Sequence, residues 1–214
     1  MPEAFKLAIL PSTKVGMTRA ALKHYLSEVH GPLVMSHKEV SGNFLSYVHH
    51  YIEGGDKMPT TAGVDAVTII EFADATHLAA SKSSTPYLDL IGPDEDNFRE
   101  EAESRAYRAV PQIVLDGPND TPVKLLVFHR QSSNGFAAHF LARFGKTSFS
   151  FGQIVSNQLT PVGHPQADDF FALDEFCLID PTDAKNMCRD LKKTAESIGL
   201  APIAVLITQP KVFV

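Results

Sequence analysis

The chain has 214 residues, of which 44% are hydrophobic and 21% are charged. These fractions are typical of a globular protein, and they exclude a disordered chain, a coiled coil and a disulfide scaffold. Asp and Glu outnumber Lys and Arg by 25 to 19, which gives a formal net charge of −6. This balance argues against nucleic acid and anionic membranes as partners, because phosphate recognition needs clustered Lys and Arg.

The sequence also predicts a cytoplasmic location. It contains no apolar run of about 18 residues, the length at which a membrane-spanning helix is expected. The first ten residues include Glu3 and Lys6 and lack the apolar core of a signal peptide. The two cysteines, Cys177 and Cys188, are expected to be reduced. A small molecule, or a second copy of the chain, is the expected partner.

The first half of the chain predicts strands and helices in the order β-α-β-β-α-β. The strands are expected at residues 5–10, 44–52, 64–72 and 107–115. One helix begins at Thr18, another follows the N-cap residue Asp74, and a short helix is expected within residues 86–98. Because proline lacks a backbone N–H, Pro32 should end or kink the first helix near His30.

The same order begins again after a turn-rich linker at residues 116–120. Strands are expected at 123–128, 149–157, 170–180 and 203–208, with helices at 135–144 and 183–197, the latter capped by Thr182. We therefore predict two ferredoxin-like repeats, residues 1–118 and 119–214.

Both faces of the predicted strands carry apolar residues, so the sheet face without helices should also be buried. The predicted fold class is α+β, with the two repeats forming a pseudo-dimeric α/β barrel. The alternative is a pair of ferredoxin-like domains that each associate with another chain.

His30 is the leading candidate for proton transfer. It falls near the expected end of the first helix, where the helix dipole favours the protonated ring. A histidine that titrates near neutrality can take or give a proton without a metal ion. The alternative role is a helix-end residue that anchors the Gly31–Pro32 turn.

The second strand places Tyr47, His49 and Tyr51 on one face, since side chains alternate along a strand. Phenol and imidazole groups suit the wall of a pocket that orients an enolised aromatic substrate. The alternative is an ordinary core with hydrogen-bonded polar tips. Asp65, on the third strand, would have a raised pKa and could act as a base if it faced a closed barrel. The alternative is a solvated carboxylate at a strand end.

No metal or cofactor is predicted. The acidic run Asp94–Asp96 lacks the spacing of a calcium loop and is read as a surface turn. His24, His30 and His37 do not share one face, and no phosphate-binding loop or serine-nucleophile motif occurs.

Several stretches resemble the EthD family of dimeric α/β barrels. They are Tyr25–Val34, Gly42–Tyr47, Gly63–Asp74, Ser84–Tyr87 and Pro93–Phe98, and together they fall within residues 5–115. The second half lacks the His-Gly-Pro-Leu-Val stretch and resembles a degenerate copy, which implies one site per chain. The resemblance adds Tyr87 as a substrate-binding candidate.

The resemblance implies a mixed set of activities. The family includes a protein needed for ether degradation and relatives that decarboxylate, dehydrate, cyclise or isomerise aromatic polyketides. Related barrels act as cofactorless oxygenases, and more distant ones bind haem.

We therefore expect metal-free acid–base chemistry, as a lyase, isomerase or cyclase, on a small aromatic or polyketide-like molecule. His30, His49 and Tyr47 would be catalytic, and Tyr51, Asp65 and Tyr87 would bind substrate. No cofactor is expected, and a homodimer is possible. The alternatives are a cofactorless oxidoreductase of the same fold and a non-catalytic binding or dimerisation protein.

Overall fold

The computed structural model describes residues 5–57, 63–132, 135–163, 169–200 and 203–214. Eight strands are assigned in this part of the chain. They are β1 (Phe5–Leu10), β2 (Phe44–Gly55), β3 (Ala66–Phe72), β4 (Arg105–Leu115), β5 (Val123–His129), β6 (Phe151–Pro161), β7 (Ala172–Leu178) and β8 (Ile203–Val212).

The helices fall between the strands in the expected order. In the first half they are α1 (Arg19–Tyr25), α2 (Gly31–Ser36), α3 (Lys38–Ser41), α4 (Ala75–Ser83) and α5 (Gly92–Glu95), with π-helical segments at Leu26–His30 and Tyr87–Ile91 and a 3₁₀ turn at Glu101–Glu103. In the second half they are α6 (Phe136–Ser148) and α7 (Ala184–Ser197), with a 3₁₀ turn at Pro181–Asp183.

The eight strands form a closed antiparallel barrel in the order β1-β3-β2-β8-β5-β7-β6-β4. Around the closed barrel, the strands of the first half follow one another as β4-β1-β3-β2, and those of the second half as β8-β5-β7-β6. Both runs have the fourth strand of the repeat first, then the first, third and second strands, which is the order of a ferredoxin-like sheet. The predicted fold class is confirmed.

The residue contacts divide the chain into two compact units. Unit 1 contains most of the first half up to Arg108 together with Lys211–Val214, and unit 2 contains Ile52–Lys57 and Ala109–Pro210. The predicted repeat boundary between residues 118 and 119 stays a prediction.

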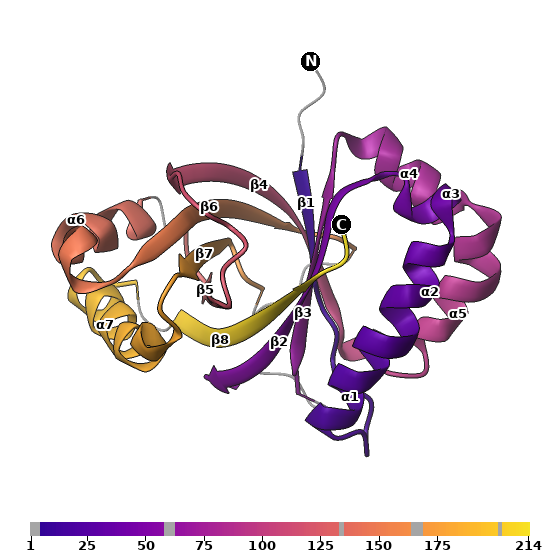
Figure 1. Ribbon diagram of the computed structural model, residues 1–214, viewed down its shortest axis with the longest axis horizontal. Helices are drawn as coiled ribbons and strands as arrows, with labels where there is room; N and C mark the ends of the chain where they lie inside the picture. Colours follow the sequence, from indigo (N-terminus) through magenta and orange to yellow (C-terminus); the bar gives the residue numbers. More distant parts are fainter. Residues whose placement is uncertain (1–4, 58–62, 133–134, 164–168, 201–202) are drawn as a thin grey trace. The chain divides into compact units, whose positions relative to one another are not determined.

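In unit 1 the helices cover one face of the sheet formed by β1, β3 and β2 (Figure 1). Strand β3 lies between its two antiparallel neighbours, with Leu7 and Tyr47 both opposite Ile70. Tyr51 packs with Leu22 and Leu26 of the first helical region, and Tyr47 packs with Val34 of α2. The helix-covered face of β2 is therefore the face that carries Tyr47, His49 and Tyr51.

In unit 2 the core lies between the strands and the helices α6 and α7, which are drawn beside each other in Figure 1. Helix α7 buries Met187, Leu191 and Ala195, which recur at the spacing of three to four residues expected for one helix face. The predicted cap of this helix is wrong. A 3₁₀ turn precedes the α-helix: Asp180 caps this turn by accepting the backbone N–H of Thr182, and Asp183 is the N-cap residue of α7.

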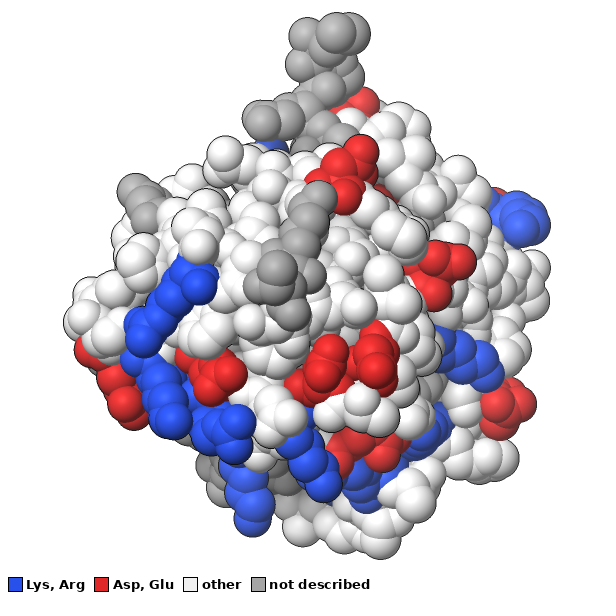
Figure 2. All heavy atoms as spheres, turned by 60° about the vertical axis from the view of Figure 1, so that its left-hand side comes forward, with Lys and Arg blue, Asp and Glu red and all other residues white. Residues whose placement is uncertain are grey.

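The displayed surface carries charges of both signs. Figure 2 shows Lys and Arg side chains intermingled with Asp and Glu side chains on this face. Within the described residues, no helix has the length and apolar character required to cross a membrane.

Candidate functional site

Two similar corners build the centre of unit 1. Each is a five-residue π-helical segment followed directly by Gly-Pro and a short α-helix: Leu26–His30 precedes Gly31 and Pro32, and Tyr87–Ile91 precedes Gly92 and Pro93. In each corner the glycine N–H donates to the carbonyl five residues earlier. Single π-helical turns often mark functional sites.

Pro32 is expected to end or kink the first helix near His30. It does not end the helical path, but a π-helical turn at Leu26–His30 interrupts the regular α-helix there. The helical path continues through Pro32 to Ser36, because the π-helical turn accommodates a residue that has no N–H to donate. One carbonyl remains to be satisfied. In π-helical register, Ser27 O would accept from residue 32, which is proline, and Lys211 Nζ donates to it instead at 2.9 Å. The same ammonium group lies 3.1 Å from Glu28 Oε1.

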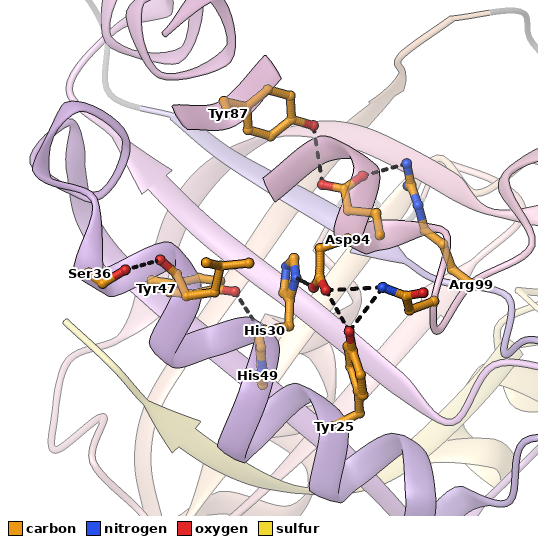
Figure 3. A network of polar contacts seen from close by, with 11 residues as sticks. Tyr25, His30, Ser36, Tyr47, His49, Tyr87, Asp94 and Arg99 are labelled. Atoms are coloured by element: carbon orange, nitrogen blue, oxygen red, sulfur yellow. Dashed lines mark hydrogen bonds and ion pairs between the residues drawn. The ribbon is translucent and has the colours of Figure 1, made fainter. Parts of the chain in front are cut away.

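The two corners meet at His30 and Asp94 (Figure 3). His30 Nδ1 lies 2.8 Å from Asp94 Oδ2. The other carboxylate oxygen of Asp94 accepts the Tyr25 hydroxyl and the Asn97 amide. Asn97 also donates to the Tyr25 hydroxyl at 3.1 Å, so three side chains hold the carboxylate in place. The Phe98 and His30 rings pack in a T-shaped arrangement, with ring centroids 4.8 Å apart.

The charges of this pair follow from its surroundings. Burial alone would raise the pKa of Asp94, but hydrogen bonds from Tyr25, His30 and Asn97 outweigh it and lower the pKa. Asp94 is thus an ionised acceptor at neutral pH, which assigns the His30 proton to Nδ1 and leaves Nε2 as a base. Burial lowers the pKa of His30, although the bond to Asp94 partly opposes this.

The structure corrects the expected electrostatics of His30. The sequence predicts a helix end whose dipole favours the protonated ring. Because the helical path continues past Gly31, no helix terminus lies at His30, and desolvation favours the neutral ring instead.

His49 lies between two tyrosines of the same strand. Its Nε2 lies 2.7 Å from the Tyr47 hydroxyl, and its Nδ1 lies 3.4 Å from the Tyr51 hydroxyl. His49 is completely buried, and burial lowers its pKa well below the usual value, reinforced by His30, His50 and Lys211. Desolvation raises the pKa of Tyr47 as well, and raises the pKa of Tyr51 to about 12. All three groups are therefore neutral near pH 7.

The His30 and His49 rings face each other in nearly parallel planes, 18° apart, with centroids separated by 6.4 Å. The three predicted catalytic residues thus form one cluster. Phe213 covers the cluster: its ring lies 5.1 Å from the Tyr47 ring and 4.9 Å from the His49 ring, centroid to centroid. The prediction that the three side chains open onto a shared cavity stays a prediction.

The predicted substrate-binding residues lie in different surroundings. Tyr51 belongs to the His49 group. Asp65 precedes β3 and accepts Arg19 Nε–H at 2.8 Å and the Thr13 hydroxyl at 3.3 Å, so these contacts belong to an ion pair apart from the histidines. Tyr87 donates to Glu95 Oε1 at 3.1 Å, and Arg99 binds the other oxygen of that carboxylate.

Asp94 is the residue that sequence reasoning missed. The acidic run was interpreted as a surface turn, yet the Asp94 side chain is only 13% exposed and pairs with His30. The signal that would have found it is the repeated Gly-Pro pair, because Asp94 follows directly after the second one. The described residues contain no group of three His, Cys, Asp or Glu side chains placed to hold a metal ion.

Unit 2 contains a buried His–Asp pair of its own. His129 Nε2 lies 2.9 Å from Asp174 Oδ2, and both side chains are enclosed. A separate cavity of about 250 Å³ occurs in this unit, and it is lined by Gln112, Ser132, Ser156, Gln158 and Phe171 among others. None of the six predicted site residues lines it.

Comparisons with known proteins agree with this architecture. Residues 14–102 match the model of the EthD domain, and this range includes all six predicted site residues. Comparison with curated proteins gave no match.

Solved structures show the same fold at low sequence identity. A proposed monooxygenase from Lactobacillus acidophilus NCFM is 8% identical, with a TM-score of 0.58 over 98% of this chain and 95% of that chain. An anthrone oxidase-like protein is 9% identical, with a TM-score of 0.62 over 99% and 94%. A proposed chlorite dismutase is 8% identical, with a TM-score of 0.55 over 99% and 96%.

Proposed function

We propose, on the match of residues 14–102 to the EthD domain model, that this protein is a small-molecule enzyme that performs metal-free acid–base chemistry on an aromatic, polyketide-like substrate. The observation that carries the proposal is the buried His30–Asp94 pair beside the neutral His49–Tyr47 pair. A positioned base and a positioned phenol are what proton abstraction next to an aromatic ketone requires.

His30 acts as the base in this proposal. Asp94 accepts the Nδ1–H and thereby fixes the tautomer, so that Nε2 carries the lone pair that takes a proton from the substrate carbon. The imidazolium that forms is stabilised by the ionised carboxylate 2.8 Å away. Asp94 is a positioning residue, since it acts through His30.

Tyr47 supplies the matching acid. Its hydroxyl donates a hydrogen bond toward the enolate oxygen of the substrate, and the neutral His49 carries protons between Tyr47 and Tyr51 by exchanging its tautomer. Burial of these groups keeps the reacting carbanion away from water, and electrostatic contacts are stronger in such a water-free site.

Anthrone is a suitable probe, because it is an aromatic ketone with an acidic C10–H. The purified protein is incubated with anthrone in D₂O under argon, and deuterium entering C10 is followed by mass spectrometry. The proposal expects enzyme-dependent exchange, with His30→Ala reducing the rate roughly 10²–10⁴-fold.

His24→Ala is the matched control, since His24 lies on the same helical path and is exposed. It should leave the exchange rate unchanged. Exchange that is equal in wild type and His30→Ala would contradict the assignment of the base.

A second candidate function is a cofactorless oxidation, favoured by the enclosed Tyr47 and His49 and by the fold shared with an oxidase-like protein. In air, the anthrone carbanion would react with O₂, so that anthrone and one O₂ give anthraquinone and one water. Oxygen uptake that matches anthraquinone formation and is lost in His30→Ala would select this function. Exchange under argon without uptake in air would select the isomerase or lyase function.

A further inference from the structure

Lys211–Val214 lies directly on the predicted catalytic cluster. Tyr47 N–H donates to Val214 O at 2.7 Å, and Phe213 N–H donates to Tyr47 O at 2.9 Å, so the segment adds a short strand contact beside Tyr47. Between these bonds the Phe213 ring contacts both Tyr47 and His49. Tyr47 is only 2% exposed and His49 is completely buried, so in this arrangement no substrate reaches either group.

Gly31, the first residue of α2, leaves room for the Phe213 ring. A Cβ at Gly31 would lie 2.3 Å and 2.4 Å from two carbons of the Phe213 ring, which is inside any real contact distance. The equivalent glycine of the second corner differs, because a Cβ at Gly92 would meet its nearest atom, the Tyr87 carbonyl oxygen, at 3.1 Å. Gly31 therefore serves the seating of Phe213 as well as the turn before Pro32.

Lys211 fastens the segment to the same helix. Its ammonium group bonds the Ser27 carbonyl that the proline corner leaves without an N–H partner, and it pairs with Glu28 at the helix surface. Lys211 and Val212 are the last residues of β8, which is hydrogen-bonded to β2, and Phe213 and Val214 extend beyond this strand. Strand ends open locally at a lower free energy than the sheet as a whole, so the segment can open without unfolding the sheet.

We propose that Lys211–Val214 is a strap that closes the His49–Tyr47 cluster and must open to admit substrate, with Phe213 as the cover and Lys211 as the latch. The gating role rests on the proposed function of these side chains, whereas the closure itself is tested without any substrate.

Diethyl pyrocarbonate, which modifies neutral imidazole, provides this test. His49 and His50 are adjacent, both are buried, and they point to opposite faces of β2, so His50 is an internal control that the strap does not cover. Trypsin releases both in the peptide of residues 39–57, and tandem mass spectrometry reports each rate separately.

Phe213→Ala removes the ring that lies over His49, and Gly31→Ala displaces it. Each variant should raise the His49 modification rate roughly tenfold relative to that of His50, which corresponds to about 1.4 kcal/mol of lost closing free energy. Gly92→Ala should leave the ratio at the wild-type value. An unchanged ratio in both Phe213→Ala and Gly31→Ala would overturn the proposal.

If a variant unfolds enough for both histidines to react, Lys211→Met provides the test through the same ratio of His49 to His50 modification rates. This substitution removes the ammonium group that acts as the latch, and it keeps the Phe213 ring and most of the apolar part of the side chain. A ratio that stays at wild type in Lys211→Met would then overturn the proposal. An absence of anthrone exchange leaves this measurement intact, so failure of the strap and failure of the proposed function are distinguished.

Discussion

His30 and Asp94 are 64 residues apart in the chain, and their side chains meet at 2.8 Å because each lies beside a Gly-Pro corner of the same construction. The pair is the point at which the two corners are joined.

Asp94→Asn should slow proton abstraction while leaving the fold in place. The neutral amide no longer fixes the His30 tautomer and no longer supports the imidazolium, so the exchange rate should fall by roughly 10²-fold or more. In the wild type the Asp94 carboxylate raises the pKa of His30 and opposes the effect of burial. The pKa of His30 should therefore be lower in this variant than in the wild type. NMR titration of the His30 ring measures this shift, and a raised pKa would contradict the pairing.

Tyr47→Phe should destabilise the fold. It removes the hydroxyl that lies 2.7 Å from His49 Nε2 and leaves a buried ring nitrogen without that partner. Such a loss costs about 1–3 kcal/mol of unfolding free energy. Urea unfolding measures it, with Tyr51→Phe as the control, whose longer 3.4 Å contact predicts a smaller loss. Equal losses in the two variants would contradict the assigned geometry.

The unfolding free energy should fall as the pH is lowered from 7 to 5. The folded pKa of His49 lies well below 6.5, and that of His30 is also lowered, so the unfolded chain binds these protons first. Protonation therefore favours unfolding as the pH falls below about 6.5, by up to about 1.4 kcal/mol per pH unit for each proton.

The His49 contribution to this pH dependence is isolated by substitution. His49→Gln should flatten the slope of unfolding free energy against pH, measured by urea unfolding at several pH values. His24→Gln, at an exposed position, should leave the slope unchanged. A slope that is the same in wild type and His49→Gln would show that His49 does not titrate as a buried neutral ring.

Pro32 and Lys211 should be energetically coupled. In the wild type, Lys211→Met loses the hydrogen bond to the Ser27 carbonyl, worth about 1 kcal/mol of unfolding free energy. In Pro32→Ala, residue 32 regains an N–H that can serve the same carbonyl, so Lys211→Met should cost less. A double-mutant cycle in urea should give a coupling of about 0.5 kcal/mol or more, and additive effects would contradict the link.

Much of the fold could be predicted from the sequence. Alternating apolar residues predicted the strands, and the repeated element order predicted the barrel, because both patterns can be read along the chain. The face of β2 that carries Tyr47, His49 and Tyr51 followed from the period of two alone.

The remaining features depend on contacts between distant residues. The polarity of Asp94–Asp96 suits a surface turn, and only the second Gly-Pro corner brings Asp94 to His30. Of the end or kink predicted at Pro32, the helix end does not occur, because a π-helical turn accommodates the missing N–H. Phe213 is an apolar residue directly after β8, and its place over His49 is set by the absence of a side chain at Gly31.

The carbonyl of Ser27 gives a means of reading related sequences. Its hydrogen bond is supplied by Lys211 because residue 32 is proline, whereas in the second corner the equivalent carbonyl belongs to Leu88, which is 59% exposed and can be served by water. Covariation is therefore expected at one corner only. In related sequences without proline at position 32, Lys211 is no longer needed for the Ser27 carbonyl and keeps only its contact with Glu28. Substitution of Pro93 should not be accompanied by a change at another position.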